Sequence, residues 1–300
     1  MPILAVQLNH PGAQKKYPSN GYIHLNNNII RKWNTDRSHY RKFILNSGIY
    51  LRSKTDTPNK GGLLFWSEWE GYSWFSPYGN QPNKFYPNGY HKPFHNLINR
   101  GAQNTDPYVF GDRFYYATCR QKGQMCRLDK YSLIIFGTPD ERGYFLLDTV
   151  FVVNDFEDSA IVKGNKAANY SKVYKEETLD QLKEYLGQGN KINPEKKLYH
   201  SLTWGENKEF FSFVPCKAEP QENIIGFERL KIPVHLLYPF INMDLTQEPR
   251  VPVKFLVTNN LTLIHKVWNV IVDFTLQQKF YLGIKFLEPS LGNLSNQVID

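Results

Sequence analysis

The sequence predicts a mixed α+β fold with a β-rich main domain, formed as a barrel or a curved mixed sheet, and a C-terminal helix packed on it. Short runs rich in aromatic and β-branched residues recur between Gly, Pro and Asn residues, as β-rich folds require. Helical periodicity, in contrast, is confined to two segments. With 300 residues, 41% of them hydrophobic, the chain can bury a substantial core.

The apolar runs locate the expected elements. Strands are expected at Ile3–Leu8, Leu63–Trp69, Phe114–Thr118, Leu133–Phe136, Tyr144–Val153, Phe210–Pro215 and Phe227–Ile232. Glu176–Leu186 has leucines at helical spacing and precedes two glycines, and Leu261–Phe280 carries an apolar stripe, so both predict helices. We therefore expect a main domain at residues 1–245 and a helical segment at residues 246–300. Residues 71–104, rich in Pro, Gly, Asn and Tyr, predict an irregular loop that is either functional or poorly ordered.

Charge and composition favour a nucleic-acid partner. The formal net charge is +8 and 15% of the residues are aromatic. Cations attract phosphates, and aromatic rings stack on bases that have left the duplex. Segments that interleave cations with rings predict DNA-backbone contacts at Arg31, Lys32, Arg37, Arg41, Lys42 and Lys92. The alternative is a mildly basic surface that serves only solubility.

The sequence shows no pattern typical of a metal site, a cofactor site, a membrane helix or a signal peptide. The three cysteines lack zinc spacing, so we expect no metal, and no Gly-rich phosphate loop indicates a cofactor. No stretch of about 18 uncharged apolar residues predicts a membrane helix. The N-terminus lacks the pattern of a signal peptide, which predicts a cytoplasmic protein. No obligatory protein partner is inferred.

Two acids in an aromatic run are the first catalytic candidates. Glu68 and Glu70 follow Trp66 at alternate positions, so a strand would place all three side chains on one face. Carboxylates among indoles and beside a like charge exchange protons closer to neutral pH. A solvated strand face, or pairing with Lys or Arg, is the equally weighted alternative.

Three further polar positions lie at expected strand ends or loop edges. Pro107 would hold the Asp106 carboxylate rigidly, either for catalysis or as a turn that caps the following strand. Asn9 and His10 follow the first strand and offer groups for a base edge, or they form an ordinary turn. Asp148 lies in an apolar strand, and we expect a structural carboxylate paired with backbone or with an Arg.

The middle of the chain resembles a known group of proteins. The similarity is carried by Trp66–Glu70, Thr105–Asp112, Tyr116–Gln121, Tyr131–Gly137 and Phe145–Val153, and it spans roughly positions 1 to 235. These motifs resemble bacterial and phage proteins of the nucleotide-modification-associated kind, which in turn resemble PUA-like β-barrels that hold a flipped base. The further resemblance is to anti-phage DNA glycosylases that excise hypermodified bases such as glucosylated hydroxymethylcytosine. Asp106–Tyr108 is also similar to the water-activating loop of uracil-DNA glycosylases.

The resemblance implies a PUA-like main domain and a DNA glycosylase that flips and excises a modified, glycosylated base from double-stranded phage DNA. The expected catalytic residues are Glu68, Asp106, Asn9 and Glu70. The expected base-binding residues are His10, Trp69, Tyr108, Tyr116, Tyr90, His91 and His95. One alternative is a non-catalytic reader of modified bases, and another is a protein-interaction or small-nucleotide-binding module.

Overall fold

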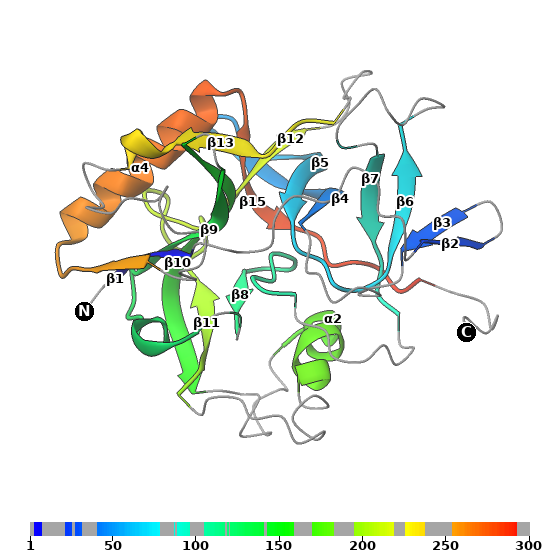
Figure 1. Cartoon of the computed structure of the whole chain (residues 1–300), viewed down its shortest axis with the longest axis horizontal. Helices are drawn as coiled ribbons and strands as arrows, with labels where there is room; N and C mark the ends of the chain where they lie inside the picture. The colour runs from blue at the N-terminus through cyan, green and yellow to red at the C-terminus, as the bar shows by residue number, and fades with distance from the viewer. Residues whose placement is uncertain are drawn as a thin grey trace.

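Two β-sheets form most of the structure, a computed structural model, and one long helix covers the first sheet (Figure 1). The structure describes residues 3–7, 22–25, 28–31, 41–78, 87, 89–96, 105–117, 119, 121–140, 143–158, 170–182, 195–218, 226–237 and 254–292. It describes only the backbone of residues 3–7, 22–25, 28–31, 139–140, 158 and 254–257.

The first sheet is mixed, and within the described residues it has seven strands. Its order is β14-β1-β9-β10-β11-β8, and β13 pairs with one end of β10. β1 and β9 run parallel, whereas the other pairs are antiparallel. Its strands are β1 (Ile3–Gln7), β8 (Tyr115–Tyr116), β9 (Leu133–Asp140), β10 (Tyr144–Asp158), β11 (Lys197–Ser201), β13 (Leu230–Pro233) and β14 (Lys254–Val257).

The second sheet closes on itself. Among the described strands its order is β15-β12-β5-β4-β7-β6-β3-β2, and β15 also pairs with β4, which makes a four-stranded barrel of β4, β5, β12 and β15. A Cβ atom on Gly48 would lie 2.4 Å from the Lys285 carbonyl oxygen, so glycine permits the close approach of β4 and β15. The strands are β2 (Tyr22–Leu25), β3 (Asn28–Arg31), β4 (Lys42–Leu51), β5 (Asn59–Ser67), β6 (Ser73–Pro77), β7 (Gly89–Pro93), β12 (Val214–Ala218) and β15 (Tyr281–Phe286).

Helix α4 (Leu261–Gln277) packs on the first sheet. The Asn260 side chain accepts a hydrogen bond from the Leu263 N–H at 3.1 Å and caps its first turn. Its buried residues recur at helical spacing and form one core with residues of β9, β10 and β13. The predicted C-terminal helix and β-rich barrel are thus confirmed. Residues 246–300 also contribute β14 and the barrel strand β15, so this segment is not helical alone.

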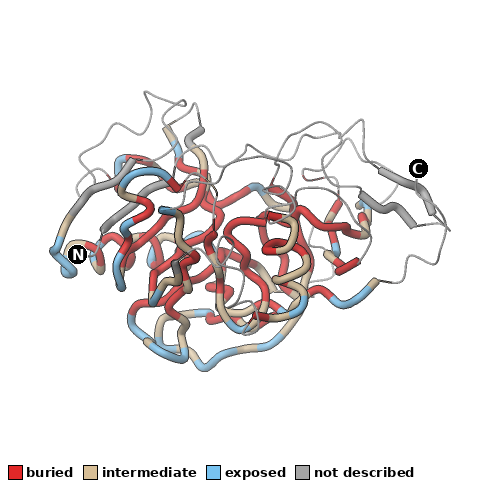
Figure 2. Tube along the Cα trace, turned by 90° about the horizontal axis from the view of Figure 1, so that it is seen from below, coloured by how far each residue is buried: buried red, intermediate tan, exposed pale blue. Residues whose placement is uncertain are grey.

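The remaining helices are short. They are η1 (Gly123–Cys126), α2 (Lys172–Tyr174), the π-helix η3 (Lys175–Leu179) that continues α2, and η4 (Val234–Leu236). The helix expected at 176–186 therefore begins earlier, and its described part ends at Leu182. Buried residues run continuously through both sheets (Figure 2), so the core spans the sheet junction where the polar groups below lie.

Several strand predictions require correction. β5 ends at Ser67, two residues short of the prediction, so Glu68 and Glu70 lie after the strand rather than on one of its faces. Strand β4 was not predicted, because polar and glycine residues interrupt its apolar pattern. The prediction of an irregular loop at 71–104 is wrong for β6 and β7, which are regular antiparallel strands.

Candidate functional site

A buried ion pair lies where β4 begins and β5 ends. Lys42 is opposite Ser67 in the antiparallel register, so Arg41 and Glu68 follow as the next facing positions. The Arg41 guanidinium donates a hydrogen bond from Nη1 to the Glu68 carboxylate. Their side chains are only 1% and 3% exposed. The strand ladder therefore brings a cation and an anion together inside the molecule.

A second carboxylate reaches Arg41 from the other sheet. Asp148 is the extra residue of a β-bulge in β10, and bulges redirect side chains. Arg41 Nε donates to Asp148 Oδ2 at 2.8 Å, and Arg229 Nη1 donates to Asp148 Oδ1 at 3.1 Å. We call Arg41, Glu68, Asp148 and Arg229 the charge network. The expectation of a structural Asp148 paired with an Arg is confirmed.

Arg41 keeps its charge inside the charge network. Burial lowers the pKa of Arg41, but the charges and hydrogen bonds of Asp148 and Glu68 outweigh burial and raise that pKa above its ordinary value. Two cations thus face two anions with almost no solvent. Such networks add little net stability relative to apolar packing, but removal of one member leaves an uncompensated buried charge. The network links the start of β4 and the end of β5 to β10 of the other sheet.

Two more predicted carboxylates lie in loops near this network. The Glu70 backbone N–H donates to Thr105 Oγ1 at 2.9 Å, which ties the end of β5 to the loop that carries Asp106. Glu70 and Asp106 are 2% and 0% exposed. The Asp106 carboxylate accepts hydrogen bonds from the N–H groups of Ala117 at 2.8 Å and Cys119 at 2.6 Å. Asp106 therefore holds the turn after β8 rather than capping the start of the strand that follows it.

The thiol of Cys119 shows that these carboxylates converge. Its pKa is raised well above the ordinary value, first by burial and then by the negative charges of Asp106, Glu68 and Glu70, with Arg41 as a partial offset. A neutral thiol thus lies within electrostatic reach of three acids from two loops. We call Glu68, Glu70, Asp106 and Cys119 the carboxylate cluster. The structure brings together three of the four predicted catalytic residues; Asn9 lies outside the described residues.

The rings expected to stack on a base belong to the core. Trp69, Tyr108 and Tyr116 are 1%, 0% and 0% exposed. Trp69 packs edge-on against Phe110 with ring centroids 5.2 Å apart, and its Nε1 donates to the Tyr72 carbonyl at 2.7 Å. The prediction that these rings face a base is therefore wrong for this conformation, because a base would have to displace core packing.

The predicted base-binding residues on and after β7 do not share one face. Tyr90 and His91 are consecutive strand residues, so their side chains point to opposite faces. Tyr90 is half-buried, and the Nζ atom of exposed Lys92 lies 5.6 Å from its ring centroid. His91 is buried, with Nδ1 2.9 Å from Ser73 Oγ. A single base-binding group of Tyr90, His91 and His95 is therefore contradicted, while Tyr90 and Lys92 remain accessible.

His95 lies between two carboxylates. Its Nδ1 is 2.7 Å from Glu177 Oε1, and its Nε2 is 2.7 Å from Glu176 Oε2. Burial lowers the pKa of His95, but hydrogen bonds and charges from Glu177 and then Glu176 outweigh burial and raise that pKa above its usual value. We call these three residues the histidine clamp. Both acids come from the π-helix η3, and π-helical turns are frequent at functional sites.

The histidine clamp and the carboxylate cluster are neighbours. Gly71 directly follows Glu70, and a Cβ atom on Gly71 would lie 2.9 Å from Glu177 Oε2 and 2.6 Å from the Trp69 ring. Glycine is therefore required where the loop after β5 passes the clamp. Sequence reasoning missed Glu176, Glu177, Cys119 and Arg229. Only the first two carried a signal, as adjacent acids at the start of a predicted helix.

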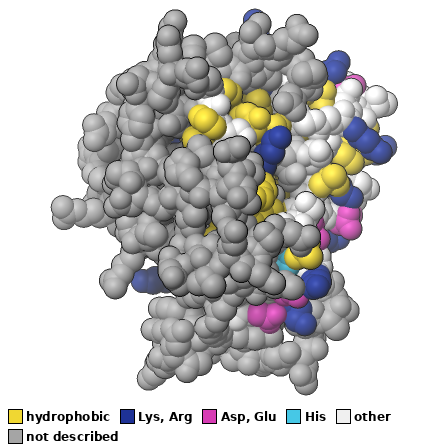
Figure 3. Space-filling view, turned by 90° about the vertical axis from the view of Figure 1, so that its right-hand side faces the viewer, with side chains coloured by type: hydrophobic (Ala, Val, Ile, Leu, Met, Phe, Trp, Pro, Cys, Tyr) yellow, Lys and Arg dark blue, Asp and Glu magenta, His cyan; other side chains and the backbone are white. Residues whose placement is uncertain are grey.

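The residues predicted to contact the DNA backbone differ in where the structure places them. Arg41 and Lys42 are 1% and 4% exposed, and Lys42 Nζ donates to the Trp69 carbonyl, so the prediction that they face DNA phosphates is wrong. The Arg31 side chain, Lys32, Arg37 and His10 lie outside the described residues. On the described part of the face in Figure 3, Lys and Arg side chains lie among hydrophobic and acidic ones.

Neither a metal-binding cluster nor a membrane-spanning helix is present in the part of the chain that the structure describes. No group of three or more His, Cys, Asp or Glu side chains is arranged to hold a metal ion there. None of the described helices is both long and apolar enough to cross a membrane. Comparisons with protein-family models, with curated proteins and with solved structures found no match to the chain. The geometry above is therefore the basis for the functional argument.

Proposed function

We propose that the protein is a DNA glycosylase that flips a modified base into a site at the carboxylate cluster and cleaves its N-glycosidic bond. The observation that carries this proposal is the hydrogen bond from the Glu70 N–H to Thr105 Oγ1, which places the buried loop of Glu68 and Glu70 beside buried Asp106. Cleavage of the bond builds positive, oxocarbenium-like charge on the sugar, which fixed carboxylates stabilise. A PUA-like domain, built on the closed barrel, would hold the flipped base, and phage DNA in the cytoplasm would be the substrate.

The three acids would have different tasks. Asp106 is oriented by two backbone N–H donors, and Glu68 is oriented by Arg41, so both would act as fixed negative charges. Glu70, held through its backbone by Thr105, would orient the attacking water or stabilise the sugar directly. Because the cluster is buried, substrate entry requires the surrounding loops to open when DNA binds.

The test compares duplexes with and without glucosylated hydroxymethylcytosine, followed by alkaline cleavage of abasic sites. We expect the wild-type protein to form abasic sites only in the modified duplex, and Glu70→Gln to reduce their formation by about 10²-fold or more. Glu209→Gln, which changes an exposed acid, is the matched control. Denaturation curves establish that Glu70→Gln folds, and Glu70→Asp is the second variant. Undiminished excision by folded Glu70 variants would remove Glu70 from the mechanism.

A non-catalytic reader of modified bases is the second candidate. One observation favours it: Asp106 and Glu68 already bind protein groups, as structural carboxylates do. A reader would retain modified duplex with a salt-dependent affinity and form no abasic sites. The same duplexes, measured for retention and for cleavage, therefore separate the two functions.

A further inference from the structure

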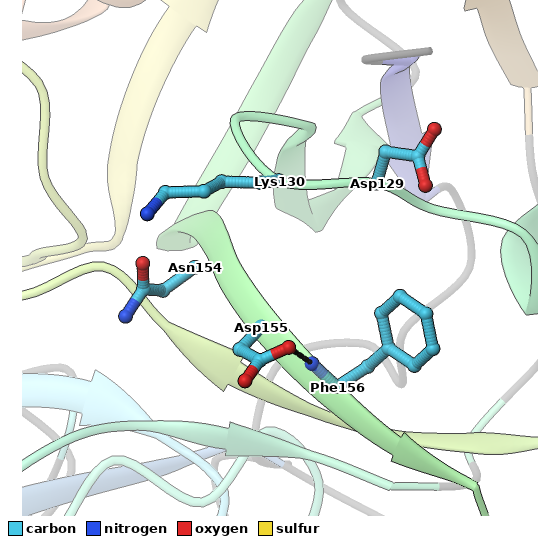
Figure 4. Close-up of a pocket in the computed structure, with 5 residues that line it drawn as sticks. All are labelled: Asp129, Lys130, Asn154, Asp155 and Phe156. Carbon is cyan, nitrogen blue, oxygen red and sulfur yellow. Dashed lines mark hydrogen bonds between the residues drawn. The ribbon is translucent and has the colours of Figure 1, made fainter.

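A pocket of about 530 Å³ lies beside the far half of β10 (Figure 4). It is lined by Asp129, Lys130, Asn154, Asp155 and Phe156. The volume is within the range of about 300–1,000 Å³ typical of small-molecule sites. Asn154 is six residues along β10 from Asp148, or about 20 Å at roughly 3.3 Å per residue. The pocket is therefore distant from the place where Asp148 joins the charge network.

A β-bulge shapes one wall of the pocket. Val153 is opposite Ser201 and Asp155 is opposite His200, so Asn154 is an extra residue in β10. In a regular strand, consecutive side chains point to opposite faces and could not all line one pocket. The bulge allows positions 154, 155 and 156 to do so. Bulges are over-represented next to functional sites, where they redirect side chains.

A strained turn forms the opposite wall. The Ser132 N–H donates to the Asp129 carbonyl at 3.0 Å, and Tyr131, the third residue of this turn, has a φ of 68°. Glycine usually occupies that position in a type II turn, and a bulky residue there strains the backbone. The Tyr131 N–H also donates to the Val153 carbonyl at 2.7 Å, which fixes the turn to β10. Backbone strain of this kind clusters at ligand-binding positions.

The lining is rich in hydrogen-bond acceptors and carries more negative than positive charge. Two carboxylates and the Asn154 amide oxygen face one ammonium group, that of Lys130. Asn154 Nδ2 donates to Glu206 at 3.1 Å, which orients the amide. Asp155 Oδ1 accepts from the Phe156 N–H at 2.8 Å, and Oδ2 has no hydrogen bond to the described residues. This balance disfavours a phosphate and favours a neutral ligand with several hydroxyl donors.

We propose that this pocket binds a sugar. Asp155 Oδ2 and the Asn154 amide oxygen accept hydrogen bonds from neighbouring hydroxyls, and Lys130 donates to a sugar oxygen. In Figure 4, Lys130 and Asn154 extend to one side of the pocket and Phe156 lies on the other. Lys197 Nζ lies 3.5 Å from the centroid of the Phe156 ring, so the opposite face of the ring is the one that contacts the C–H groups of the sugar. The sugar is either a free saccharide or one attached to nucleic acid.

Titration with the methyl α- and β-glucosides, followed by NMR chemical shifts, tests the proposal. We expect saturable binding to the wild-type protein and at least about tenfold weaker binding to Asp155→Ala, because a charge-assisted hydrogen bond is lost. Asp155→Asn keeps the size of the side chain and should be weakened less. Asp273→Ala, an exposed acid on α4, is the matched control and should bind like the wild type. Absence of saturable binding, or equal binding by Asp155→Ala, would overturn the proposal.

A second measurement distinguishes the two sources of the sugar. Wild-type and Asp155→Ala proteins are compared for retention of glucosylated and unmodified duplexes. Weaker retention of the glucosylated duplex alone assigns the pocket to sugars on nucleic acid. Unchanged retention of both duplexes, with loss of methyl glucoside binding, assigns it to a free saccharide. Both arms measure binding rather than excision, so their result is independent of the proposed glycosylase activity.

Discussion

The charge network and the histidine clamp both bury ionic groups, but they differ in what holds the charge. The network balances two arginines against two carboxylates, and arginine stays protonated at every physiological pH. The clamp places one imidazole between two carboxylates. Histidine is the side chain whose charge changes near neutrality. The clamp, which attaches η3 to the residues after β7, therefore contains a side chain whose ordinary pKa lies near neutral pH, whereas the residue types of the network have ordinary pKa values far from it.

Replacement of Arg41 should lower the free energy of unfolding more than any other change predicted here. Arg41→Ala leaves Glu68 without its guanidinium partner and Asp148 with Arg229 alone, so we expect the free energy of unfolding to fall by about 3–5 kcal/mol. Urea denaturation measures it. Arg113→Ala, which breaks a partly exposed pair with Glu206, is the control and should cost about 1 kcal/mol or less. A similar small loss for Arg41→Ala would show that the network does not hold the sheets together.

The free energy of unfolding of the wild type and of His95→Gln, measured by urea denaturation over a series of pH values, tests the histidine clamp. The folded-state pKa of His95 is raised, so its contribution to stability is complete below its unfolded pKa of about 6.5 and is lost as the pH rises through the folded value. We expect the wild type to exceed the variant by about 1.5–3 kcal/mol at low pH and by less at high pH.

The test is the difference in the free energy of unfolding between the wild type and His95→Gln at each pH. Burial lowers the pKa values of His200 and His265, which gives pH dependence of the opposite sign in both proteins and cancels in the difference. His235→Gln, at an exposed position, controls for the change of residue type. A difference that stays constant with pH would mean that His95 does not titrate in the clamp.

Two tyrosine hydroxyls near the clamp give the smallest effects. Tyr108 donates to Glu288 at 3.2 Å, and Tyr108→Phe should cost about 1 kcal/mol. The Tyr174 hydroxyl is buried and has no hydrogen bond to the described residues, so Tyr174→Phe should be neutral or slightly stabilising. Chemical denaturation of both variants compares them directly. A loss at Tyr174 as large as at Tyr108 would reveal a hydrogen bond that this conformation does not contain.

Local patterns predicted the elements with a simple periodicity. Helix α4 follows from Ile264, Val267 and Ile271, and β9 and β10 follow from unbroken apolar runs. Strand β4 escaped prediction because Asn46–Gly48 interrupts its pattern and its stability comes from pairing with distant strands. Propensity is weaker than such tertiary context.

The sequence identified several residues of the candidate site but did not identify the residues that they contact. Glu68, Glu70 and Asp106 stand out as acids among aromatic residues, and the structure buries all three. Arg41 was misread as a surface cation, because basic residues beside rings are typical of nucleic-acid grooves. Its partner Asp148 lies 107 positions away, and no local pattern reports such a contact.

The barrel can close only after its last strand, β15, has been synthesised. Leu51 of β4 pairs with Leu282 of β15, so 231 positions separate the two strands that close the ring. At about 5–20 residues per second, a ribosome needs roughly 10 to 50 s to add that stretch. Until then β4 and β12 each lack a neighbour, and unpaired edges invite pairing with other chains. The nascent protein is therefore expected to depend on chaperones until β15 leaves the ribosome.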